Sequence, residues 1–145
     1  MLRRLCYPAS VRQFDPSQYY SYVGDSRNRA QIGPAGWVPD YLVASNFLDL
    51  FKCKTFVPRS DWENLNLFEF CDSALDAEMK QAQAVQGSDS SRAAELYSDV
   101  DRKLVDRAVA VPFGSPRKEV LVSERVGNFQ AHPLWGTLLD QLWVR

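Results

Sequence analysis

A tryptophan and an aspartate stand three residues apart in a glycine-punctuated, mostly apolar segment, and both residue types can contact a small ligand. The segment reads Gln31-Ile32-Gly33-Pro34-Ala35-Gly36-Trp37-Val38-Pro39-Asp40-Tyr41. Tryptophan gives a pocket a large apolar wall and one N–H donor. A carboxylate accepts charge-assisted hydrogen bonds, which are roughly twice as strong as neutral ones. From residue types alone, Trp37 is equally a core residue, and Asp40 is better explained as a turn or helix-cap carboxylate.

Two neighbouring residues are weaker candidates for ligand contact. Tyr41 follows Asp40 directly, and Asn46 opens the run Asn46-Phe47-Leu48. Asparagine is among the preferred residues at the first position of a helix, so the sequence favours a capping role for Asn46.

The sequence gives little support for catalysis. His132 is the only histidine, and a zinc site normally needs three or four protein ligands. The chain has no Gly-x-Ser-x-Gly nucleophile motif, no glycine-rich phosphate loop and no Cys-x-x-Cys pair. We therefore expect no enzyme activity, no cofactor and no metal site.

Composition narrows the class of protein further. The chain has 145 residues, 46% apolar and 24% charged, with a net charge of -1. One domain of this length can bury a core, but it carries no basic field for nucleic acid. No apolar run reaches the roughly 18 residues that span a bilayer. The basic N-terminal residues lack the apolar stretch of a signal peptide, which taken literally predicts a cytoplasmic chain.

The first half of the chain is predicted to contain one clear helix and one buried strand. Asp15 and Pro16 suit the N-cap and first position of a helix that ends at Gly24. Residues 30–38 show little polar alternation, as in the middle of a sheet. A short helix over residues 46–51 precedes a long irregular loop over residues 52–70. Apolar side chains available to pin that loop are Trp62, Leu65, Leu67, Phe68 and Phe70.

Two helices and several strands are predicted in the second half. Ser73 and Asp76 form a weak capping-box pattern before a helix with Leu75, Met79 and Ala82 on one face. A second helix follows residues 87–91, and its apolar face holds Leu96, Tyr97, Val100, Leu104, Val105 and Ala108. Residues 109–113, 120–122, 126–129 and 138–144 are predicted strands. The mixture of helices and strands predicts an α/β (mixed) fold.

The chain has three cysteines, Cys6, Cys53 and Cys71. A bridge between Cys53 and Cys71 would close a loop of about 18 residues and contribute roughly 3 kcal/mol if unstrained. From spacing alone, two reduced, half-buried thiols are favoured over the bridge. No role is assigned to Cys6.

Five motifs, taken in order, resemble a known family. They are Gly36-Trp37-Val38-Pro39-Asp40-Tyr41, Asn46-Phe47-Leu48, Phe70-Cys71-Asp72 with Leu75-Asp76, the helix around Glu95-Leu96-Tyr97 before an apolar strand, and the tail from Arg125 to Arg145. The chain from about Tyr20 onward resembles the C-terminal region of the family 5 extracellular solute-binding proteins, the peptide-binding components of ABC importers. The tail is most similar to actinobacterial members.

The resemblance implies a fold and a site. The chain would be the C-terminal part of a periplasmic-binding-protein-like fold (type II, cluster C) with two lobes. Residues 1–50 would form the end of one lobe and the crossover, and residues 51–145 the loop, the helical pair and the return strands. By position, Asp40 would hold a peptide amine and Trp37 would line the side-chain pocket, with Tyr41 and Asn46 as further contacts. The resemblance also favours the Cys53–Cys71 bridge.

The function that the resemblance implies is capture of a peptide or similar small polar solute for transmembrane transport. Its partners would be the permease subunits of an ABC transporter and a missing N-terminal lobe, and its place would be extracellular, at the cell envelope. Exposed apolar faces on the isolated chain would favour self-association. One departure is Leu42-Val43-Ala44-Ser45, where many relatives carry a proline step. The alternative is a free-standing, truncated interaction domain without ligand capture.

Overall fold

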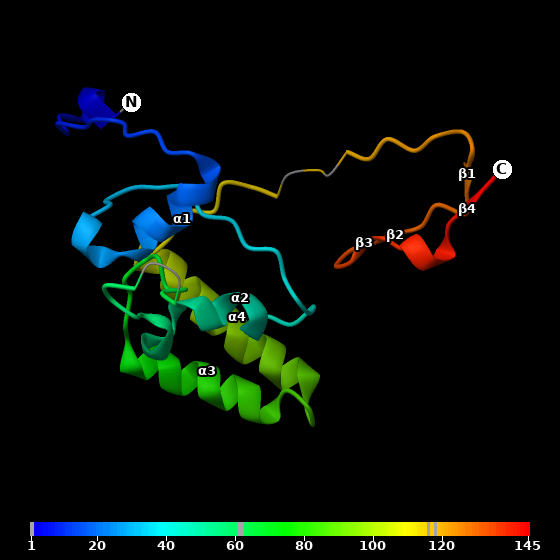
Figure 1. Cartoon of the computed structure of the whole chain (residues 1–145). Coiled ribbons are helices and arrows are strands. Elements are labelled where there is room, and N and C mark those ends of the chain that lie inside the picture. The colour runs from blue at the N-terminus through cyan, green and yellow to red at the C-terminus, as the bar shows by residue number, and fades with distance from the viewer. Residues whose placement is uncertain (1, 61–62, 116, 118) are drawn as a thin grey trace.

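The computed structural model describes residues 2–60, 63–115, 117 and 119–145. Its α-helices are α1 (Pro16–Gly24), α2 (Ser45–Leu48), α3 (Ser73–Val85) and α4 (Ser90–Asp106). Short 3-10 turns lie at Leu2–Leu5, Ser26–Asn28, Asp49–Phe51, Cys53–Thr55 and Leu139–Gln141. Four two-residue strands follow α4 (Figure 1). The prediction of a mixed α/β chain is confirmed at this coarse level, with helices dominating.

The core lies between α3 and α4, which run side by side (Figure 1). The predicted apolar stripe of α3 is confirmed, because Leu75, Met79 and Ala82 are all buried. From α4, Tyr97, Val100 and Leu104 face them, and Ala93 is buried as well. The predicted face of α4 is wrong at its end, since Val105 is half exposed and Ala108 lies beyond the helix. Leu48, Leu50 and Phe51 cover the pair from one side.

Aspartates start three of the helices. The Asp15 side chain accepts from the Ser17 N–H at 2.9 Å, which confirms the predicted start of α1. The capping box at Ser73 is wrong, because Asp72 is the N-cap of α3 and accepts from the Ala74 and Leu75 N–H groups at 2.8 and 3.1 Å. Asp89 caps α4 in the same way.

The loop after α2 is irregular, as predicted, and is organised around Asn66. This side chain is fully buried; its Nδ2 donates to the carbonyls of Lys52 and Phe70 at 3.2 and 2.7 Å. The structure bonds Cys53 to Cys71, with 4.4 Å between their Cα atoms. Asp76, which the sequence placed in a cap, instead accepts from the Cys53 N–H.

Aromatic side chains pin this loop to the core. Phe68 stacks on Phe51 with 4.6 Å between ring centroids, and Phe70 packs against the same cluster. Leu67 is half-buried. Leu65 is exposed, so the prediction that it pins the loop is wrong. Trp62 lies outside the described residues.

The segment before α2 is not the predicted buried strand. Residues 30–38 have no regular secondary structure, and every one of them is exposed. Pro34 and Pro39 lack the N–H that a central strand needs. Where this segment meets α1, the Tyr19 hydroxyl donates to the Pro34 carbonyl at 2.7 Å.

The C-terminal strands form two small antiparallel ribbons. β1 (Val126–Gly127) pairs with β4 (Trp143–Val144), and β2 (Ala131–His132) pairs with β3 (Gly136–Thr137). Of the predicted strands, residues 109–113 and 120–122 are not strands, because they have no neighbouring strand to pair with in the described part of the chain. Figure 1 shows the ribbons standing apart from the helices.

The extended tail leaves the molecule with a large surface. Its accessible area is 11642 Å². A compact monomer of 16.5 kDa is expected to expose about 7,600 Å². Large apolar side chains contribute to the excess, and Phe113 and Leu121 are fully exposed.

Candidate functional site

The side chain of Asn46 brings two of the other predicted site residues together. Its Oδ1 accepts from the indole Nε1 of Trp37 at 2.7 Å and from the backbone N–H of Asp40 at 3.2 Å. Its Nδ2 donates to Oδ2 of Asp40 at 3.4 Å. We call this arrangement of Trp37, Asp40 and Asn46 the Asn46 clasp. The predicted capping role of Asn46 is wrong, because Ala44 is the N-cap of α2 and Asn46 reaches back to the preceding loop.

Burial of Asn46 explains why the clasp is ordered. Asn46 is only 7% exposed, and its amide therefore depends on protein partners. The single N–H donor of Trp37 is used in the bond to Asn46. The remaining indole surface is apolar, and the residue is 38% exposed. The Asp40 side chain is exposed. Among the described residues, no cation forms an ion pair with Asp40, and its carboxylate can accept further hydrogen bonds.

Tyr41 is not part of the clasp. It lies beside Asp40 in the chain and is 49% exposed. Its backbone carbonyl accepts from the Val43 N–H at 3.0 Å, where the chain turns toward α2. Tyr41 is thus placed as a neighbour of the site.

A groove lies between α2 and α4, near the clasp in sequence. It has a volume of about 380 Å³ and is lined by Ala44, Phe47, Leu48, Ala94, Tyr97, Ser98 and Asp101. At its floor, burial raises the pKa of the Tyr97 hydroxyl, which donates to Oε1 of Gln86 at 3.2 Å. Asp101 is the one charged residue among the seven. We call this feature the α2/α4 groove.

Sequence reasoning missed this groove. A signal was present, because Ala94, Tyr97, Ser98 and Asp101 recur at spacings of three and four on one helix face. The α2 wall, however, depends on tertiary packing that no periodicity reveals.

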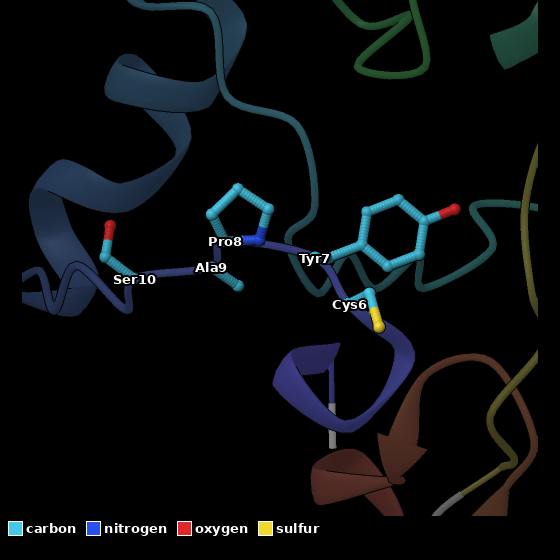
Figure 2. A pocket seen from close by; sticks show the side chains of 5 residues that line it. All are labelled: Cys6, Tyr7, Pro8, Ala9 and Ser10. Carbon is cyan, nitrogen blue, oxygen red and sulfur yellow. The ribbon is translucent and has the colours of Figure 1, made fainter.

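A second hollow lies near the N-terminus but offers a poor site. Figure 2 shows Cys6, Tyr7, Pro8, Ala9 and Ser10 following one another along a single extended stretch. Its volume is about 720 Å³. A hollow with residues of one short stretch for its wall lacks the convergent polar groups that fix a ligand.

The remaining candidate groups have structural partners. Nδ1 of His132 accepts from the N–H groups of Leu134 and Trp135 at 3.2 and 3.3 Å, and the two rings stack. Within the described residues, no three potential ligands gather as a metal site would require. No helix in that same part of the chain is both long and apolar enough to cross a bilayer.

Comparison with protein-family models, with curated proteins and with solved structures finds no match to this chain.

Proposed function

We propose that this chain binds a peptide or similar small polar solute through the Asn46 clasp, as part of the solute-binding component of an ABC importer. The observation that carries the proposal is the geometry of Asn46. One buried amide holds both Trp37 and Asp40, while the Asp40 carboxylate stays exposed and without a cation among the described residues.

The chemistry of the clasp suits the amino end of a peptide. A protonated amine needs an acceptor that carries charge, and Asp40 supplies one. The half-exposed indole of Trp37 offers an apolar surface for the neighbouring side chain. Because Asn46 fixes both groups before a ligand arrives, little ordering is left for binding to overcome.

The proposal includes a larger assembly. In it, residues 1–50 and 51–145 belong to the two lobes of a type II, cluster C fold, completed by an N-terminal lobe and docked on permease subunits. The chain exposes about 4,000 Å² more than a compact monomer of its mass, which leaves surface for contacts with further parts of such an assembly. The Cys53–Cys71 disulfide supports an oxidising location such as the cell envelope.

Thermal unfolding with and without trialanine tests the proposal. Trialanine is expected to raise the midpoint of the wild-type chain, and N-acetyl-trialanine is not, because it has no cationic amine. Asp40→Asn keeps the shape but removes the charge, and a hydrogen bond to a charged group is worth about 1.5–3 kcal/mol. The variant should therefore bind roughly 10- to 150-fold more weakly.

The matched control is Asp106→Asn, which changes an exposed aspartate at the end of α4. This variant should keep the full response to trialanine. Equal responses of wild type and Asp40→Asn, or equal responses to both peptides, would show that Asp40 is not the amine anchor.

The exposed apolar side chains favour a second candidate, a free-standing interaction domain without ligand capture. Four of these side chains are between 73% and fully exposed: Val111, Phe113, Leu121 and Trp135. A cooperative melt that no peptide moves would favour this candidate over solute capture.

A further inference from the structure

The lining of the α2/α4 groove is complementary to an apolar group that carries one positive charge. Phe47 is 43% exposed at its rim, and the other walls are apolar except for Ser98 and Asp101. The adjacent Arg102 does not neutralise Asp101, because it pairs with Asp99. No ion pair to Asp101 occurs within the described residues. A large apolar side chain next to a positive charge would therefore complement the groove.

The C-terminal ribbon of the same chain carries that combination. Trp143 lies opposite Gly127 in the β1–β4 pair, and its ring covers that glycine so closely that an added Cβ would come within 2.2 Å of it. The indole is still 49% exposed. The guanidinium of Arg145 lies 5.4 Å from the ring centroid.

A second cation supports this platform. Arg125 donates to the backbone carbonyl of Arg145 from two of its nitrogens, at 3.4 and 3.5 Å, and the Arg145 N–H donates to the Arg125 carbonyl at 2.9 Å. The ribbon thus presents one aromatic ring with the Arg145 guanidinium beside it, and Arg125 holds the backbone of Arg145 in place. Tryptophan and arginine are among the residue types enriched at the energetic centre of protein interfaces.

We propose that the β1–β4 ribbon of one copy docks in the α2/α4 groove of a second copy, with Trp143 against Phe47 and Tyr97 and with Arg145 paired to Asp101. Figure 1 shows that the ribbon stands apart from the helices of its own chain, and no ribbon residue lines the groove. The chain exposes about 4,000 Å² beyond a compact monomer, more than the roughly 800 Å² that each partner buries in a stable interface.

This inference is separate from solute capture. The contact uses Phe47 of α2, the facing side of α4 and the C-terminal ribbon, whereas the clasp joins Asn46 of α2 to Trp37 and Asp40 in the preceding loop. Asp40→Asn should therefore leave the association unchanged, so failure of either idea can be recognised without the other.

Sedimentation equilibrium over a wide range of protein concentrations tests the contact. The wild-type chain is expected to associate reversibly. Trp143→Ala should weaken the association about 30-fold or more, the loss typical of a central interface residue. Trp135→Ala is the matched control, since Trp135 is an even more exposed tryptophan of the same region, at 73%. It should leave the association constant unchanged.

A charge exchange tests the pairing itself. Asp101→Arg and Arg145→Asp should each abolish association alone, because each places like charges together. An equimolar mixture of the two variants should associate again, since every groove then meets a ribbon of opposite charge. Asp106→Arg on α4 controls for the added charge and should associate as wild type does.

Three outcomes would overturn the proposal. The first is a wild-type chain that stays monomeric at all concentrations, which includes the case of a ribbon that docks on its own groove. The second is association that Trp143→Ala leaves intact. The third is a mixture of Asp101→Arg and Arg145→Asp that remains monomeric while circular dichroism shows both variants folded.

Discussion

Replacing Asn46 by alanine tests whether one side chain organises the candidate site. The change removes the bonds from Trp37 Nε1 at 2.7 Å and from the Asp40 N–H at 3.2 Å, and the longer contact to Asp40 Oδ2 at 3.4 Å. Each of the two shorter bonds contributes about 0.5–1.5 kcal/mol to stability. Trp37 and Asp40 lie at the surface, so water can replace Asn46 as their partner, which limits the loss.

The expected cost is therefore about 1–3 kcal/mol. In a chain of this size each kcal/mol moves the thermal midpoint by roughly 2–4 °C, so the midpoint should fall by about 2–12 °C. The loss should be local. Amide hydrogen exchange is expected to speed up in residues 36–44, while α4, whose core face packs on α3, keeps its protection.

Hydrogen exchange followed by mass spectrometry, together with a calorimetric melt, measures both effects. Asn28→Ala is the control, because the exposed Asn28 amide makes a hydrogen bond of 2.9 Å to the Tyr22 carbonyl and none to a clasp residue. It should leave exchange in residues 36–44 as in wild type. Unchanged exchange there in Asn46→Ala, with a midpoint within a degree of wild type, would refute the idea that Asn46 holds the loop.

Two further predictions concern stability. Reducing the Cys53–Cys71 bridge, which spans 18 residues, should cost about 3 kcal/mol and lower the midpoint by about 10 °C; a melt with and without dithiothreitol checks this, and equal melts would contradict it. Acid should destabilise the fold, because three helix-capping aspartates have a lowered pKa. The hydrogen bond from the Leu75 N–H lowers the pKa of Asp72 below its ordinary 3.8. The Ser17 hydroxyl lowers the pKa of Asp15 in the same way, and the Arg27 side chain lowers that of Asp25. Stability from a lowered carboxyl pKa is present above pH 3.8 and is lost as pH falls through the folded-state value, so Asp72→Asn should flatten the acid limb of the stability curve measured by urea titration. An acid limb as steep as that of wild type would count against this role of Asp72.

Local patterns predicted the helices well. Asp15 and Pro16 marked the start of α1, and the spacing of Leu75, Met79 and Ala82 marked the buried face of α3. Both signals act within one or two turns of helix, so neighbouring residues suffice to read them.

Strands were predicted poorly because a strand is stabilised by pairing with another strand, which local sequence does not show. Residues 30–38 and 120–122 have the apolar character of strands but find no partner strand among the described residues, and they remain exposed. Apolar content predicts that a segment can form a strand, whereas pairing decides whether it does.

The sequence singled out residues of the candidate site but did not predict the hydrogen bonds that join them. Trp37, Asp40 and Asn46 were singled out, yet Asn46 was expected to serve the helix that it begins. Its amide instead serves a loop six to nine residues earlier, a contact set by how the chain turns at residues 41–44. Side-chain to backbone bonds of this range carry no sequence periodicity, so only the folded geometry shows them.

The disulfide has a consequence for proteolysis. Residues between Cys53 and Cys71 form a covalent ring, and Lys54 and Arg59 inside it are exposed. A trypsin-like protease that cuts after either residue would leave the two products joined through sulfur. Asn66 keeps bonds to Lys52 and to Phe70, which lie on opposite sides of either cut, so the nicked ring also retains a non-covalent tie. Such a nick would leave an undivided band on a non-reducing gel and become visible only after reduction.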